Sequence, residues 1–331
     1  MTAPHHVSCI GGDLLSATRR LLAGGLIASL ALTVAQAGGV TVTGADGRTV
    51  EVADTSRVVS IGGAITEILY ALGREDRIVA VDSTSLYPSS AQSKPNVGYM
   101  RQLSAEGVLG LNPSLVLASK DSGPKETMAV LSSARVPLVL VPDRYSGEGV
   151  LEKIKIVAQA VEADAQGECL AAAVRRDLET LAGLRKRIDK PLRVMFVLSL
   201  MNGRPMVSGV DTAANGIIAM AGGVNAIQAY AGYKQINDEA VIAAEPDVVL
   251  MMQRAGEHVT ADQVFQMSAF SMTPAASKRA FVSMDGLYLL GFGPRTAQAA
   301  RDLATTLYPA IAKGSEPPSG PTVKTAASEC R

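Results

Sequence analysis

Residues 98–118 read GYMRQLSAEGVLGLNPSLVLA, and residues 232–251 read GYKQINDEAVIAAEPDVVLM. In both segments an acidic residue precedes a proline by seven positions, and an apolar run follows the proline. Each copy therefore predicts a loop, a short helix opened by the acidic residue, a stop at the proline and a buried strand. Because only two such copies occur, far apart in the chain, they indicate two lobes of one architecture and not a solenoid.

Strand and helix patterns alternate around the first copy. The predicted strands are 57–61, 78–81, 115–118 and 138–141, and the predicted helices are 66–72 (capped by Thr66), 104–111 and 125–134. Before them, residues 40–52 alternate as in a hairpin whose turn is at Asp46-Gly47. An alternating series of this kind predicts a parallel sheet with helices on both faces.

A helical pattern connects the two halves, over 148–163 and 168–188, with a predicted break at 164–167. Its second part carries an apolar stripe and would be about 30 Å long. A β pattern restarts at 193–200, and 248–252 is the strand of the second copy. We predict an α/β protein of two similar lobes with central sheets, joined by a long rigid helix, with a ligand cleft between the lobes. The expected boundaries are 38–147 for the N-terminal lobe, 148–190 for the helical connector and 191–313 for the C-terminal lobe.

The two ends of the chain have their own patterns. Arg19-Arg20 precedes an apolar run that ends in Ala35-Gln36-Ala37, which predicts a signal peptide over 1–37 cleaved near Ala37. A membrane anchor is the alternative, although the run is short for a span of about 20 residues. Residues 314–331 are rich in Pro, Ser, Gly and Thr, so a disordered tail is expected.

The composition excludes several classes of function. Among 331 residues, 31 are Lys or Arg, 31 are Asp or Glu, 4% are aromatic and none is Trp, so neither a field for nucleic acid nor a base-stacking platform is expected. Three histidines and no Cys-x-x-Cys pair argue against a multi-histidine or structural metal site. The sequence also lacks a Gly-x-Ser-x-Gly elbow, and we predict no enzyme. Cys169 and Cys330 would remain after signal cleavage, and their positions do not predict that they meet, so we interpret them as incidental.

Tyr87 is the candidate with the most specific chemistry. It lies in the segment Asp82-Ser-Thr-Ser-Leu-Tyr87-Pro88, directly after the predicted strand 78–81. Ligands of open α/β sheets bind at the carboxyl ends of strands. A phenolate is a hard anionic oxygen that can serve as an axial ligand of ferric haem. From the residues alone, an ordinary loop tyrosine is the alternative.

From Arg57 to Tyr308 the sequence resembles the haem-binding periplasmic proteins of bacterial haem-uptake ABC transporters. These belong to the helical-backbone (class III) superfamily of substrate-binding proteins. The resemblance is carried by DSTSLYP at 82–88, VGYMRQLSAEG at 97–107, GRPMVSG at 203–209, AGGVN at 221–225, AGYK at 231–234 and LGFGPR at 290–295.

The resemblance implies a role for each candidate residue. Tyr87 matches the tyrosine that binds the haem iron in this family, and Arg254 best matches an arginine of the opposite lobe that supports the phenolate. Tyr99 and Arg101 would flank the porphyrin, with packing as the alternative. Arg295, in the glycine-rich turn, would contact the ligand or anchor its loop.

Glu106 and Glu239 stand at equivalent points of the repeat. In the superfamily each lobe presents one glutamate to arginines of the membrane permease, and these two match that pattern. The resemblance thus implies a monomeric periplasmic protein that captures haem and delivers it to an inner-membrane permease with its ATPase. A vitamin B12 or ferric-siderophore carrier of the same superfamily is the alternative, and a secreted two-lobed α/β enzyme is a more distant one.

Overall fold

The computed structural model describes residues 39–201, 204–254, 256, 258–312 and 330. The chain divides after Ala37, and Gly38–Arg331 form one compact unit. The predicted signal peptide lies outside the described residues, and so does the predicted disordered tail apart from Cys330. No helix in the described ranges has both the length and the apolar character that a membrane crossing needs.

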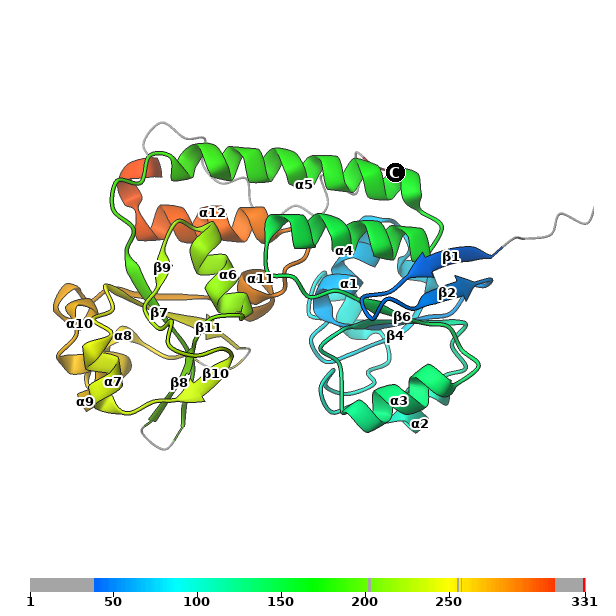
Figure 1. Cartoon of the computed structure of the whole chain (residues 1–331), viewed down its shortest axis with the longest axis horizontal. Helices are drawn as coiled ribbons and strands as arrows, with labels where there is room; N and C mark the ends of the chain where they lie inside the picture. The colour runs from blue at the N-terminus through cyan, green and yellow to red at the C-terminus, as the bar shows by residue number, and fades with distance from the viewer. Residues whose placement is uncertain (1–38, 202–203, 255, 257, 313–329, 331) are drawn as a thin grey trace, which may run out of the picture. The chain divides into compact units, whose positions relative to one another are not determined.

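The first sheet is fully parallel and has the strand order β4-β3-β5-β6. Its strands are β3 (Val58–Ile61), β4 (Ile78–Val81), β5 (Leu115–Ser119) and β6 (Leu138–Val141), and a separate hairpin joins β1 (Val40–Thr43) to β2 (Thr49–Val52). The helices between them are α1 (Gly63–Ala71), α2 (Ala105–Leu109) and α3 (Lys125–Ser133). The predicted alternation is confirmed, and Figure 1 shows this lobe in blue to green.

The second sheet is mixed and has the order β10-β8-β7-β11-β12, with β9 pairing the start of β7. Its strands are β7 (Arg193–Met201), β8 (Arg204–Ser208), β9 (Val224–Asn225), β10 (Tyr233–Gln235), β11 (Val248–Gln253) and β12 (Phe281–Asp285). Its helices are α6 (Ala213–Met220), α7 (Asp238–Ala243), α8 (Ala261–Phe265), α9 (Ser268–Ser271), α10 (Pro274–Lys278) and α11 (Gly286–Leu290). Strand β7 pairs with β11 in parallel and with β8 in antiparallel fashion. Strand β8 also pairs with β10 in antiparallel fashion.

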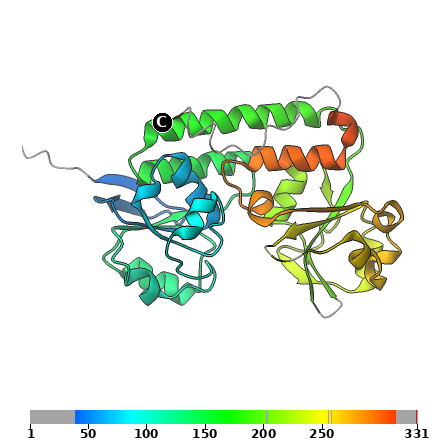
Figure 2. The same cartoon turned by 180° about the vertical axis from the view of Figure 1, so that it is seen from behind.

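Three helices form a layer shared by the two lobes (Figures 1 and 2). They are α4 (Gly147–Ala160), α5 (Asp164–Arg185) and α12 (Thr296–Leu307), and α5 packs against both of the others. The predicted long connector is therefore present as α5. The break before it differs from the expected one, because α5 already begins at Asp164. The chain turns at 161–163 instead, where Glu162 has a left-handed φ of 53°.

Residues of each central strand alternate between two buried faces, as expected for parallel strands covered on both sides. In β5, Leu115 and Leu117 join the core beneath the shared helices, whereas Val116 joins the core beneath α2 and α3. In β7, Val194 and Phe196 join the same shared core. One apolar core thus lies between the shared helices and both sheets, and it supports a stiff connection between the two lobes.

The two copies of the repeat coincide in structure as well as in sequence. Asn112 and Glu245, each immediately before the proline, both have left-handed φ values, of 47° and 43°. In each lobe an arginine from outside the repeat, Arg57 just before β3 or Arg193 at the start of β7, binds carbonyl groups just after the short helix of the repeat. Arg57 Nε donates to Asn112 O at 2.9 Å, and Arg193 Nε donates to Ala244 O at 3.0 Å. The repeat is therefore a structural unit whose short helix is capped in the same way in both lobes.

The structure corrects the interpretation of the cysteines. Cys169, on α5, and Cys330 form a disulfide, with Cα atoms 5.6 Å apart. Their sequence separation of 161 residues carries no local pattern that could have predicted the pairing.

Candidate functional site

The loop that carries Tyr87 is anchored by a buried carboxylate. Asp82 is 1% exposed and follows β4 directly. Its Oδ1 accepts hydrogen bonds from Gly62 N at 2.8 Å and Ser85 Oγ at 3.1 Å, and its Oδ2 accepts one from Thr84 N at 3.0 Å. Charge-assisted hydrogen bonds of this kind are stronger than neutral ones, so the loop is held to the start of α1.

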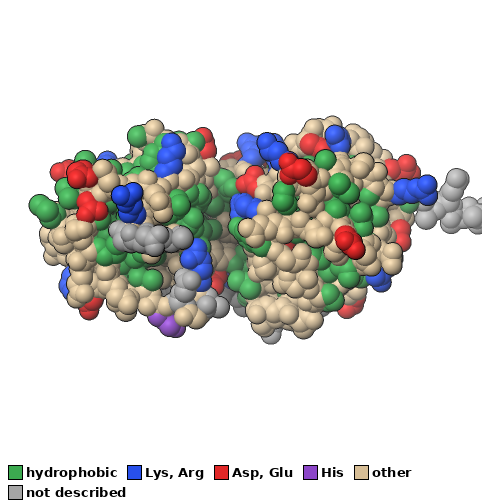
Figure 3. Space-filling model, turned by 90° about the horizontal axis from the view of Figure 1, so that it is seen from below, with side chains coloured by type: hydrophobic (Ala, Val, Ile, Leu, Met, Phe, Trp, Pro, Cys, Tyr) green, Lys and Arg blue, Asp and Glu red, His purple; other side chains and the backbone are tan. Residues whose placement is uncertain are grey.

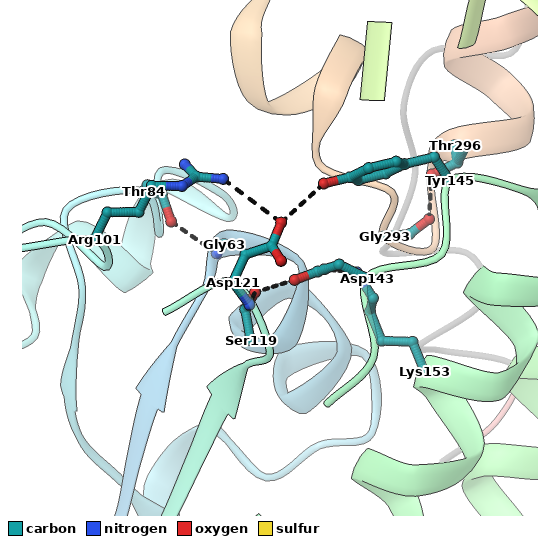
Figure 4. Close-up of polar contacts among 10 residues, drawn as sticks. All are labelled: Gly63, Thr84, Arg101, Ser119, Asp121, Asp143, Tyr145, Lys153, Gly293 and Thr296. Carbon is teal, nitrogen blue, oxygen red and sulfur yellow. Dashed lines mark hydrogen bonds and ion pairs between the residues drawn. The ribbon is translucent and has the colours of Figure 1, made fainter. Parts of the chain in front are cut away.

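The start of α1 is shaped to receive this loop. Gly62 is the N-cap residue, with φ of 121°, and Gly63 N donates to Thr84 Oγ1 at 2.9 Å (Figure 4). A Cβ at position 63 would lie 2.4 Å from Thr84 O, so only glycine fits there. The expected cap, Thr66, lies inside the helix, and its hydroxyl is 2.7 Å from Ser85 Oγ. Hence Thr66 also fixes the loop.

Tyr87 is half-buried and rests on a guanidinium group. The Cζ atom of Arg295 lies 3.6 Å from the centroid of the Tyr87 ring, a cation–π contact. Arg295 is 7% exposed and binds Glu67 on α1 through two parallel hydrogen bonds, Nε to Oε1 at 3.0 Å and Nη2 to Oε2 at 2.9 Å. Since Arg295 immediately precedes α12, the ion pair joins the two lobes.

This geometry places Arg295 behind Tyr87 rather than at an open ligand surface. Arg295 anchors its loop to Glu67, and its direct contact with a ligand stays a prediction. Burial raises the pKa of the Glu67 carboxyl, and Arg295 opposes that rise. Glu67 escaped the sequence analysis, although an acidic residue on the otherwise apolar stretch of α1 is a signal that could have found it.

Tyr99 and Arg101 lie together in the loop after β4. Arg101 belongs to a polar chain of side chains (Figure 4). Arg101 Nη1 donates to the Tyr99 hydroxyl at 2.8 Å, and its Nη2 lies 3.9 Å from Asp121 Oδ2. The Tyr145 hydroxyl donates to the same carboxylate oxygen at 3.1 Å. Burial, followed by the negative charge of Asp121, raises the pKa of Tyr145, so this phenol stays neutral.

A buried ion pair holds this row of polar side chains in place. Lys153, on α4, is 2% exposed and donates to Asp143 Oδ1 at 3.0 Å. The other oxygen of Asp143 accepts from Ser119 at the end of β5, and Ser119 Oγ accepts from Asp121 N at 3.2 Å. The position of Asp121 is thus fixed through β5 and α4.

Arg254 follows β11 in the second lobe and is exposed. Its Nη2 donates to Leu198 O of β7 at 3.4 Å. Viewed from the side opposite α5, the molecule is indented between the two lobes, with basic and acidic side chains beside the indentation (Figure 3). A separate pocket of about 340 Å³ involves Ala182, Arg185 and Gly222, and none of the predicted site residues lines it. In the part of the chain that the structure describes, no cluster of His, Cys, Asp and Glu could hold a bare metal ion.

Glu106 and Glu239 occupy the same position of two equivalent helices. Each is exposed and is the second residue of its helix, α2 or α7. The preceding cap residues also correspond, since Ser104 Oγ accepts from Gly107 N and Asn237 Oδ1 accepts from Ala240 N. A carboxylate in the first helical turn is favoured by the helix dipole whether or not it binds a partner.

Comparison with known proteins places this architecture in a family. Residues 58–287 match the family described as periplasmic binding protein. The chain belongs to the periplasmic binding protein family. This periplasmic binding protein is similar to the haem-binding protein RhuT of Roseiflexus sp. RS-1 in its apo form, with 40% identity and a TM-score of 0.72 over 78% of this chain and 100% of that one. It is also similar to the haem-binding protein BhuT in complex with two haems, with 38% identity and a TM-score of 0.72 over 77% and 98% of the two chains.

Curated relatives of this periplasmic binding protein are more distant. An uncharacterised ABC transporter substrate-binding lipoprotein of Bacillus subtilis, YvrC, is 27% identical over 259 residues, 77% of this chain and 81% of that protein. A vitamin B12-binding protein of Yersinia pestis is 26% identical over 216 residues, 65% of this chain and 73% of that protein.

Proposed function

We propose that this protein captures ferric haem in the cleft between its lobes and delivers it to the permease of an ABC importer. The observation that carries the proposal is the half-buried Tyr87, held at the carboxyl end of β4 in a chain that is 38–40% identical to two haem-binding proteins over nearly their whole length. The protein itself carries out no reaction, in keeping with relatives that are binding proteins.

Each candidate residue then has a defined task. The phenolate of Tyr87 binds the iron, and Arg254 of the other lobe supports the negative charge on that oxygen. Tyr99 and Arg101, which are already joined to each other and to Asp121, contact the edge of the porphyrin. Arginine suits this task because its planar fork can bind a propionate through two hydrogen bonds.

Titration with ferric haem tests the iron ligand. We expect Tyr87→Phe to weaken binding by at least about tenfold, or 1.4 kcal/mol, and to abolish the charge-transfer absorption of a tyrosinate-bound iron. Tyr70→Phe is the matched control, because Tyr70 is also partly buried but lies on α1 in the shared core. Full affinity and an unchanged spectrum in Tyr87→Phe would remove the proposed ligand.

The proposed partner is a membrane permease that reads one glutamate from each lobe. Charges at the rim of an interface steer and register docking more than they tighten it. We expect Glu106→Ala/Glu239→Ala to bind haem normally but to lose transport in a reconstituted importer. Glu148→Ala is the control, because Glu148 is likewise an exposed glutamate in a first helical turn. Normal transport by the double variant would contradict the docking role.

The proposed location is the periplasm, reached through a signal peptide over residues 1–37. The Cys169–Cys330 disulfide supports export, because such bonds persist in oxidising compartments. Release of a mature chain beginning near Gly38 by osmotic shock would agree with this location, whereas an uncleaved, membrane-retained chain would favour the anchor.

A vitamin B12 carrier is the second candidate, and the Yersinia relative favours it. Cobalamin already has its metal enclosed by its own ring, so Tyr87 would then make only a contact. Competition between haem and cyanocobalamin separates the two: tighter binding of cobalamin, with no effect of Tyr87→Phe, would select the second candidate.

A further inference from the structure

The ion pair of Arg295 and Glu67 is the structural feature from which we go beyond the proposed function. Both groups are almost fully buried, and they come from opposite lobes, separated by 228 residues of sequence. Glu67 Oε1 also accepts from the backbone amide of Arg295 at 3.3 Å. One carboxylate therefore fixes both the side chain and the main chain of the arginine.

The glycine-rich turn before Arg295 brings the lobes into direct contact. A Cβ at Gly293 would lie 3.4 Å from Glu67 Cδ and 3.5 Å from Ala64 Cα, which is ordinary van der Waals distance to α1. Thr296 Oγ1 donates to Gly293 O at 2.7 Å and closes the turn onto α12 (Figure 4). Because this turn is fixed to α12, the guanidinium of Arg295 moves with the C-terminal lobe.

The free face of the same guanidinium supports Tyr87. With one edge bound by Glu67, its Cζ lies 3.6 Å from the Tyr87 ring and 5.1 Å from the Tyr288 ring. The Tyr288 hydroxyl is in turn held by Asp302 of α12 at 2.8 Å. Only arginine can bind a carboxylate by its edge and stack on a ring by its face at once.

We propose that Arg295 is a positioning residue that makes the grip of Tyr87 on the haem iron depend on the contact between the lobes. The inference rests on the proposed function. The guanidinium, held at its edge by Glu67, lies over the Tyr87 ring and fixes the plane of that ring, and with it the direction in which the hydroxyl points. A displacement of the lobes relative to each other moves the guanidinium off the ring, releases the ring from this orientation and weakens the bond of Tyr87 to the iron.

The test uses a paired variant, because removing one partner alone would leave a buried unpaired charge. Glu67→Leu/Arg295→Met removes both charges together, and apolar replacement of such pairs is often neutral for stability. We expect about ten- to thirtyfold weaker binding of ferric haem, the range of one desolvated cation–π contact, and a shifted charge-transfer band. Binding of metal-free protoporphyrin IX should stay at the wild-type level.

A double-mutant cycle separates positioning from a general structural role. In a Tyr87→Phe background the same paired change should cause no further loss of ferric haem affinity, because the phenolate through which it acts is gone. Arg279→Lys, which alters an exposed ion pair with Asp262, is the control and should behave as wild type. If the paired variant does not fold, Arg295→Lys replaces it in the test, because lysine keeps the positive charge but lacks the planar group that lies on the Tyr87 ring.

Three results would overturn the inference: wild-type affinity and spectrum in the variants, an equal loss in the Tyr87→Phe background, or an equal loss for metal-free protoporphyrin. The proposed function fails by a different result, namely a wild-type protein that does not bind ferric haem.

Discussion

The two lobes place different residues at the same point of a shared framework. In the N-terminal lobe, β4 is followed by Asp82, whose carboxylate accepts hydrogen bonds from three residues around the Tyr87 loop. In the C-terminal lobe, the equivalent strand β9 ends in Asn225, whose amide donates to Ser208 O and Gly209 O and accepts from Ile227 N. Both side chains are buried. The two lobes thus share a frame, while a carboxyl group is used at this position only in the lobe that presents the proposed iron ligand.

The largest expected effect comes from removing that carboxylate. Asp82→Ala leaves the buried amide of Gly62 and the hydroxyl of Ser85 without their acceptor, so we expect a loss of about 3 kcal/mol in the free energy of unfolding. Haem affinity should fall as well, because the loop no longer holds Tyr87. Denaturant unfolding and haem titration measure the two effects.

Asn225→Ala sharpens this comparison. It should destabilise the protein by about 1–3 kcal/mol, because Ser208 O and Gly209 O each lose a donor and Ile227 N loses its acceptor, but leave haem affinity within about twofold of wild type. An equal loss of haem affinity in both variants would show that the two positions do not differ in function.

The arginines that cap the repeat helices should have a smaller effect, and a similar one in both lobes. Arg57→Met and Arg193→Met each remove donors from the carbonyl groups at the end of α2 or α7. We expect each to lower the free energy of unfolding by about 1–2 kcal/mol, with no change in haem binding. A variant that loses haem binding while remaining folded would contradict a purely structural role.

The smallest effect concerns acid sensitivity. The amide of Arg57 donates to Ser114 in one lobe, and the amide of Arg193 donates to Asp247 in the other. Burial acts to raise the pKa of Asp247, but the Arg193 amide and the Lys278 ammonium outweigh it and hold that pKa below 3.8. The ionised Asp247 therefore stabilises the folded protein fully above about pH 4, and this stabilisation is lost as the pH falls further.

Asp247→Ser introduces the residue type that Ser114 provides in the other lobe, and it should remove this dependence of stability on pH. We expect the variant to be about 0.5 kcal/mol less stable than wild type at pH 6, because the ion pair with the exposed Lys278 is screened by solvent, and the difference should vanish near pH 3. Urea unfolding across this pH range provides the measurement. A difference in the free energy of unfolding that is the same at all pH values would show that the ionisation of Asp247 is not its cause.

The sequence predicted the frame well because its signals are local. The strands 78–81 and 138–141 and the hairpin at 40–52 all follow from periodicity and turn residues within a few positions. The misplaced break before α5 has a local cause too. Asp164 is typical of loops, but here it opens the helix, where the dipole favours an acidic residue.

The support of the candidate site could not be predicted in the same way. Glu67 and Arg295 meet across 228 residues, and Asp121 and Tyr145 meet across 24, so no short pattern records either contact. Asp82 offered a signal, since an acidic residue directly after a buried strand is unusual, but its partners depend on how the loop folds back onto α1. Local pattern identifies the elements, whereas the pairs between them are properties of the fold.

The Cys169–Cys330 bond closes a covalent ring of chain whose two ends are 161 residues apart. The whole second sheet lies within that ring, and the whole first sheet lies outside it. A single protease cut inside the ring would therefore leave both pieces covalently attached until a reductant is added, while a cut before α4 would leave the N-terminal lobe with no covalent link to the rest of the chain. The ring can close only after the whole second sheet has been synthesised, because Cys330 follows all of its strands in the chain.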